Sequence, residues 1–181
     1  MLVSTENKLT TEPNAADSAL VAAAQKRDRA AFGALYARYR RMVHGILLAY
    51  TKPADAEDLM QDVFVQAMGK LSGLREPEAF GGWLTSIARR IAIDALRRRK
   101  DIVEINEGNC GSTRQRQAEM TLGLIRALPE AYRETLILRL VEGMTGPEIA
   151  FRTGLTPASV RVNLCRGMKL LRRKLGTSAD E

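Results

Sequence analysis

The sequence has very little histidine and cysteine, with a single His44 and two cysteines, Cys110 and Cys165, among 181 residues. A zinc site usually takes three or four His or Cys ligands, so this set is too small to form one. We therefore do not expect a metal-dependent hydrolase, and we predict no metal site and no cofactor. Two widely spaced cysteines also give no disulfide framework, which indicates a reducing cytoplasm.

Long apolar runs are also lacking. No stretch approaches the roughly 20 apolar residues that a membrane-spanning helix needs. The first 19 residues are polar and lack the apolar segment of a signal peptide. We therefore expect a cytoplasmic protein without membrane insertion.

Basic residues outnumber acidic ones, with 28 Lys and Arg against 21 Asp and Glu, and they are concentrated in two segments. Residues 89–100 hold six basic residues and one acid, and residues 161–174 hold six basic residues and no acid. Because these two basic stripes carry more positive charge than the net +7 of the whole chain, the remainder is mildly acidic. This distribution favours a polyanionic partner such as nucleic acid.

Apolar residues recur at spacings of three and four along most of the chain, and no useful stretch alternates with period two. This pattern predicts long helices at about residues 28–50, 54–71 and 81–100, and further helices after residue 118.

We predict an all-α protein of two small helical domains joined by a flexible linker. A linker of 17 residues reaches roughly 55–60 Å when extended. The predicted parts are a disordered tail at residues 1–16, a domain at residues 17–100, the linker at residues 101–117, a domain at residues 118–175 and a tail at residues 176–181.

The second domain contains the signals of a helix-turn-helix. Thr145 and Glu148 form a capping-box pattern at the start of a short helix, which Gly154 ends. Thr156 is then a suitable N-cap and Pro157 a suitable first residue for the last helix. Two helices joined by a tight turn, the second of them basic, are typical of a DNA-binding unit.

The last helix is the expected recognition helix. Arg161 and Arg166 can each bind a guanine edge, a contact that discriminates by about 1–3 kcal/mol, whereas basic residues further along suit phosphate. The alternative, an ordinary solvated basic face, is less favoured because a capped turn precedes the helix. The predicted DNA contacts are Arg161, Val162, Cys165, Arg166, Lys169 and Arg172.

One aromatic side chain, Trp83, is a candidate for a less specific role. Trp83 lies beside the first basic stripe and could stack an unpaired base, but its position next to Leu84 favours the core. We assign no role to His44.

Three segments resemble the extracytoplasmic-function (ECF) group of bacterial RNA polymerase sigma factors, within the sigma-70 family. DAEDLMQDVF is similar to the polymerase-binding helix of the group, and FGGWLTSIARRIAIDALRRRK to its segment for melting and recognising the minus-ten element. LPEAYRETLILRLVEGMTGPEIAFRTGLTPASVRVNLCRG is similar to its segment for the minus-thirty-five element. The resemblance spans about residues 17–175, and three blocks in the right order make it strong.

This resemblance implies a non-enzymatic protein that binds RNA polymerase core, promoter DNA in duplex and melted form, and an anti-sigma factor. Asp58, Gln61 and Asp62 would contact the beta-prime clamp helices, although acids here also favour the helix N-terminus. The loop at residues 72–77 would capture an extruded base. The residues implied in minus-ten binding and melting are Arg75, Arg89, Arg90, Arg97 and Arg98.

The sequence departs from the family pattern at two places. Arg90 stands where many members have Asn, and Arg lacks the paired donor and acceptor of an amide. The base preferred in the minus-ten element is therefore left open. Val162 and Asn163 stand where a small hydroxyl residue and a base are common.

Two other classes of protein fit the sequence less well. A stand-alone helix-turn-helix regulator would bind a two-fold symmetric site as a dimer, but it would leave DAEDLMQDVF without a purpose. An enzyme such as a nuclease would need a carboxylate cluster or an activated nucleophile, and no such set is present in the sequence.

Overall fold

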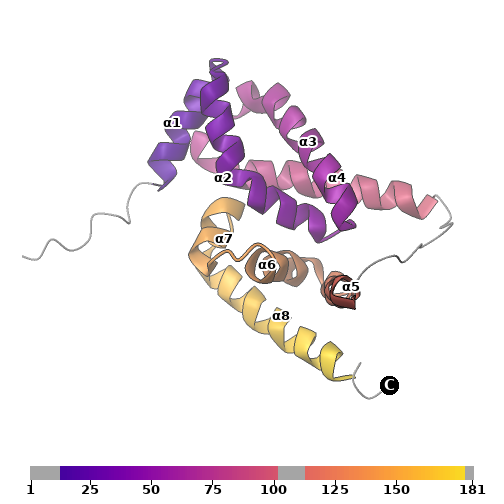
Figure 1. Cartoon of the computed structure of the whole chain (residues 1–181). Helices are drawn as coiled ribbons and strands as arrows, with labels where there is room; N and C mark the ends of the chain where they lie inside the picture. The colour runs from indigo at the N-terminus through magenta and orange to yellow at the C-terminus, as the bar shows by residue number, and fades with distance from the viewer. Residues whose placement is uncertain (1–12, 102–112, 178–181) are drawn as a thin grey trace, which may run out of the picture.

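The computed structural model describes residues 13–101 and 113–177, and within these ranges it contains helices and no strand (Figure 1). The predicted all-α fold class is confirmed. Residues 1–12 of the predicted N-terminal tail, residues 102–112 of the predicted linker with Cys110, and residues 178–181 of the C-terminal tail lie outside the described residues. The predicted domain boundaries stay predictions.

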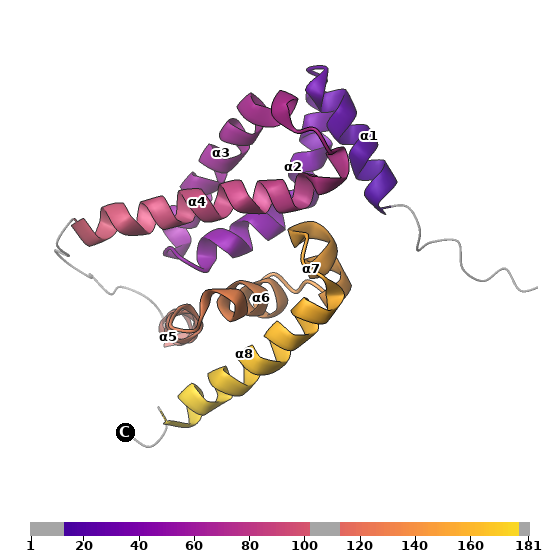
Figure 2. The same cartoon turned by 180° about the vertical axis from the view of Figure 1, so that it is seen from behind.

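The first half of the protein is built around α2, which packs against α1, α3 and α4 (Figures 1 and 2). The apolar side chains of α2 that sequence periodicity placed on one face are buried. The carboxylate of Asp28 caps this helix by accepting from the backbone N–H of Ala30 at 2.8 Å. The elements of this half are α1 (Pro13–Gln25), α2 (Arg29–Leu48), α3 (Pro53–Lys70), η1 (Leu71–Gly73), η2 (Pro77–Ala79) and α4 (Phe80–Asp101).

Helix α1 was not anticipated from the sequence. It begins at Pro13, within the segment assigned to the disordered tail, and it packs along α2. Val21 is fully buried, and the buried carboxylate of Asp17 accepts a hydrogen bond from Tyr39 Oη at 2.7 Å and another from Arg38. This helix therefore depends on contacts with α2 rather than on a strong apolar period of its own.

The second half consists of α5 (Thr113–Arg126), α6 (Glu130–Leu140), α7 (Gly146–Thr153) and α8 (Pro157–Thr177). Helix α5 begins before the predicted end of the linker at residue 117. Its first turns are polar, so they carry no apolar period, and its buried side chains Ile125 and Leu128 lie at and beyond its C-terminal end.

The predicted helix-turn-helix is present as α7 and α8. The capping box is complete, because Thr145 N donates to Glu148 Oε2 at 2.8 Å and Glu148 N donates to Thr145 Oγ1 at 3.3 Å. Gly154 has φ 74°, the left-handed conformation that ends α7. Thr156 caps α8 by accepting from Ser159 N at 3.1 Å.

The two halves contact each other, with α6 and α7 packed against α2 and α4 (Figure 2). Glycines allow this close approach. A Cβ atom at Gly81 of α4 would lie 2.4 Å from the carbonyl oxygen of Arg152, and one at Gly45 of α2 would lie 2.7 Å from a methyl carbon of Leu138. Backbone and side chains of the second half therefore occupy the space that side chains would take at these positions.

Candidate nucleic-acid interface

The recognition helix α8 presents its basic side to solvent. Val160 and Leu171 are buried, and Gly167 lies so close to α6 that a Cβ there would be 3.0 Å from Leu136. Helix α6 lies between α8 and α2 in both views (Figures 1 and 2). The predicted DNA contacts of this helix are all exposed and lie on one element: Arg161, Val162, Cys165, Arg166, Lys169 and Arg172.

The first basic stripe lies on α4, and three of its predicted contacts are exposed. Arg90 donates to Gln66 Oε1 of α3 at 2.7 Å. Arg97 lies 4.0 Å from the carboxylate of Asp94, and Arg98 Nε donates to the backbone oxygen of Asp94 at 3.4 Å. These contacts are made at the surface, so all three guanidinium groups remain accessible to a polyanion.

Arg89 behaves differently from its neighbours on α4. It donates through Nε and Nη2 to the two carboxylate oxygens of Glu134 at 2.8 and 2.7 Å, and it lies 3.2 Å from Glu130. The hydrogen bond to Glu134 raises the pKa of Arg89. Glu134 is buried and also accepts from Tyr50 Oη at 2.6 Å. While the halves pack in this way, the guanidinium of Arg89 is bound by Glu134 rather than available to DNA.

His44 joins the two halves, although sequence analysis assigned it no role. Its Nδ1 lies 2.6 Å from Glu142 Oε1 at the C-terminal side of α6, and Arg41 donates to the backbone oxygen of Glu142. The hydrogen bond to Glu142 raises the pKa of His44 above its ordinary 6.5, against an opposing effect of burial. The charged imidazolium is thus favoured by the contact between the halves.

An acidic face lies on α3. Asp58, Gln61 and Asp62 are all exposed, and their spacing of three and four places them side by side on the helix. Val65 and Met68 continue the same row and are 67% and 57% exposed. Sequence reasoning missed these two residues, although apolar side chains at i+7 and i+10 from Asp58 were a signal that the row continues.

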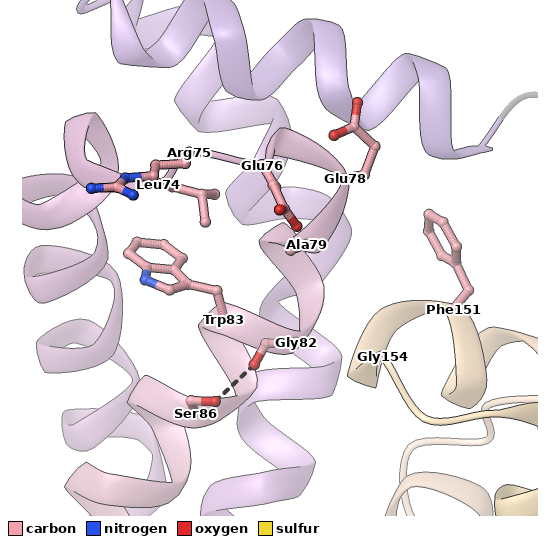
Figure 3. Close-up of a pocket in the computed structure, with 10 residues that line it drawn as sticks. All are labelled: Leu74, Arg75, Glu76, Glu78, Ala79, Gly82, Trp83, Ser86, Phe151 and Gly154. Atoms are coloured by element: carbon pink, nitrogen blue, oxygen red, sulfur yellow. Dashed lines mark hydrogen bonds between the residues drawn. The ribbon is translucent and has the colours of Figure 1, made fainter.

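A pocket of about 550 Å³ lies where the loop before α4 meets the turn of the helix-turn-helix. In Figure 3, Trp83 lies beneath Leu74 and Arg75, and Phe151 approaches from the second half. Trp83 is half-buried and its ring centroid is 5.7 Å from that of Phe80, so it is both a packing residue and part of the pocket wall. Arg75, a predicted DNA contact, is exposed at this pocket.

The part of the chain that the structure describes contains neither a metal-binding cluster nor a helix that could span a membrane. Over residues 13–101 and 113–177, no group of three or more His, Cys, Asp or Glu side chains is arranged to hold a metal ion. No helix in these ranges combines the length and the apolar character needed to cross a membrane.

A helix-turn-helix with an exposed basic second helix, and a further basic helix beside a pocket, are the features of the helix-turn-helix class of DNA-binding proteins. The chain matches the family "Sigma-70 region 2" over residues 35–102 and "Sigma-70, region 4" over residues 118–171. It belongs to the sigma-70 family of RNA polymerase sigma factors, and its relatives identify the ECF group.

Named relatives support this assignment. The chain is 28% identical to the ECF RNA polymerase sigma-E factor of Haemophilus influenzae, with 88% of this chain and 95% of the relative covered. It is 30% identical to a probable RNA polymerase sigma factor, RfaY, of Xanthomonas campestris, with 80% of this chain covered; the match spans only 40% of that longer protein. Among solved structures, CnrH in complex with the cytosolic domain of CnrY matches with a TM-score of 0.64 at 25% identity, covering 90% of this chain and 98% of CnrH.

Glu134→Ala is expected to lower the free energy of unfolding by about 1–3 kcal/mol, because Arg89 and Tyr50 lose their shared charged acceptor. Urea denaturation of the purified chain measures the change. Glu130→Ala is the matched control, since the Glu130 side chain is 48% exposed and its ion pair is worth less than about 1 kcal/mol. Equal effects of the two substitutions would contradict the role assigned to Glu134.

The contact between His44 and Glu142 is expected to make stability depend on pH. Since the pKa of His44 is raised in the folded state, its contribution is fully present below pH 6.5 and is lost as pH rises through the raised pKa. The free energy of unfolding, measured by urea denaturation across this window, should fall by up to about 1 kcal/mol. His44→Gln should remove most of this slope, and an unchanged slope in the variant would refute the assignment.

Proposed function

We propose that this protein is an alternative sigma factor of the ECF group that directs promoter-specific transcription initiation by RNA polymerase. The observation that carries the proposal is the presence, on one chain, of an exposed recognition helix α8, an exposed basic face on α4 and an exposed acidic row on α3, in the family's order. The family is non-enzymatic, and we assign no catalytic residue to this chain. It acts inside the cell with RNA polymerase, and we place it in the cytoplasm.

The second half binds the minus-thirty-five element. The N-terminal half of α8 enters the major groove, where Arg161 and Arg166 contact base edges and Val162 makes apolar contact. Lys169 and Arg172 contact phosphates further along the helix and fix its register without reading sequence. Cys165 lies next to Arg166, within the first of these two groups, and is exposed on the same helix.

The first half binds and melts the minus-ten element. Arg90, Arg97 and Arg98 on α4 contact the strand, and Arg75 lies at the pocket that receives an extruded base. Arg89 joins this set only after it leaves Glu134. The halves therefore have to separate before Arg89 engages DNA together with the other basic side chains of α4.

The acidic row on α3 docks on the polymerase. Asp58 and Asp62 pair with basic side chains of the beta-prime clamp helices, and the Gln61 amide adds a hydrogen-bonding group between them. The matched structure of CnrH contains the cytosolic domain of a second protein, CnrY. We propose that this chain is likewise held by a protein partner, an anti-sigma factor.

Reconstituted transcription tests the proposed function. Purified protein is added to sigma-free core polymerase with fragmented genomic DNA, and transcript starts are sequenced. Initiation at a few sites that share two spaced motifs is the expected result. If core polymerase stays inactive while the protein alone binds duplex DNA specifically, the protein is a stand-alone helix-turn-helix regulator instead.

Substitutions in α8 and α3 are expected to separate two activities. Arg161→Ala and Arg166→Ala should each weaken promoter selectivity by about 10- to 100-fold without reducing polymerase binding, because they remove base contacts. Gln61→Ala and Asp62→Ala should each weaken polymerase binding without reducing promoter selectivity. Fluorescence anisotropy with core polymerase and transcription from the mapped promoters measure the two activities. Equal loss of both in all four variants would count against the assignment.

A further inference from the structure

Gln25, the last residue of α1, bridges the two ends of the turn that leads into the pocket. Its side-chain Nε2 donates to the backbone oxygen of Leu71 at 3.0 Å and to that of Leu74 at 2.7 Å. An amide group has two N–H donors, so each carbonyl takes one of them. Gln25 is more than 40 residues away from both partners in the sequence, and the contact exists only because α1 packs against η1 and η2.

The turn held by Gln25 sets the position of the pocket wall. Leu71 is buried and Leu74 N donates back to Leu71 O at 3.1 Å, which closes the turn. Leu74 and Arg75 follow at once and line the pocket opposite Trp83 (Figure 3). A shift of the turn therefore moves Arg75 relative to the ring of Trp83.

We infer that Gln25 is a positioning residue, which sets base preference at the minus-ten element by fixing the turn that carries Leu74 and Arg75. It touches no DNA itself and acts through the two backbone carbonyls. This inference rests on the proposed function, because it requires that the pocket receives a base. It assigns a role in base selection to α1, a helix that lies outside the segments matched to the family.

Two variants at position 25 and one control variant at position 117 test this inference. Gln25→Met keeps the length and shape of the side chain and removes both donors. Gln25→Lys keeps donors on a side chain of similar reach, and should rescue the turn. Gln117→Met is the control, since it makes the same chemical change on the exposed surface of α5.

The measurement uses holoenzyme and fork-junction oligonucleotides taken from promoters mapped with the wild-type chain, with each minus-ten base replaced in turn. Because Gln25→Met removes two hydrogen bonds, we expect it to reduce the preference for the favoured minus-ten base by about tenfold. Gln25→Lys and Gln117→Met should stay within about twofold of wild type. Affinity for core polymerase should be unchanged in all three variants.

Hydrogen exchange provides a second readout. The amides of residues 72–76 should exchange faster in Gln25→Met than in wild type or Gln25→Lys. Unchanged base preference or unchanged exchange in Gln25→Met would overturn the inference, as would an equal loss of polymerase affinity, which indicates general misfolding. If the wild-type chain supports no promoter-specific initiation, the proposed function itself fails. If the wild-type chain does support such initiation and Gln25→Met has the same base preference as wild type, only this inference fails.

Discussion

The buried carboxylate of Glu134 is the interaction on which the arrangement of the two halves depends. A buried charge is tolerated only when it is paired and hydrogen-bonded, and both partners of Glu134, Arg89 and Tyr50, come from the first half. Separation of the halves would leave this carboxylate on α6 to water and would release a guanidinium on α4. The same ion pair therefore joins the two halves and keeps Arg89 bound, while Arg90, Arg97 and Arg98 of the stripe stay exposed.

The rest of the junction is partly apolar and partly polar, and fully buried Leu138 of α6 packs against Gly45 of α2. It combines glycine contacts, such as Gly81 against the Arg152 carbonyl, with polar pairs, such as His44 with Glu142. Interfaces between domains of one chain are typically more polar than a core, and relative motion is then the ordinary expectation. Polar groups at such a surface find partners in water or in a larger complex once the halves part.

The three proposed binding surfaces differ in how much they depend on that junction. The exposed face of α8 and the acidic row of α3 are accessible while the halves pack together. The pocket beside Arg75 is shared, because Phe151 of the second half forms part of its wall. Opening of the junction would therefore change the minus-ten site while leaving the other two surfaces as they are.

The sequence by itself determined the helices other than α1, the capped turn at Thr145 and the exposed basic face of α8, because periodicity and caps depend on residues within a few positions of each other. Only the tertiary structure decided that Arg89 is bound while Arg90 is exposed, since Glu134 lies 45 positions from Arg89. The contacts of α1 could not be predicted from the sequence for the same reason, since Gln25 lies 46 and 49 positions from Leu71 and Leu74. Gln25 contacts carbonyl groups, which every residue carries, so no pattern of side chains in the sequence marks its partners.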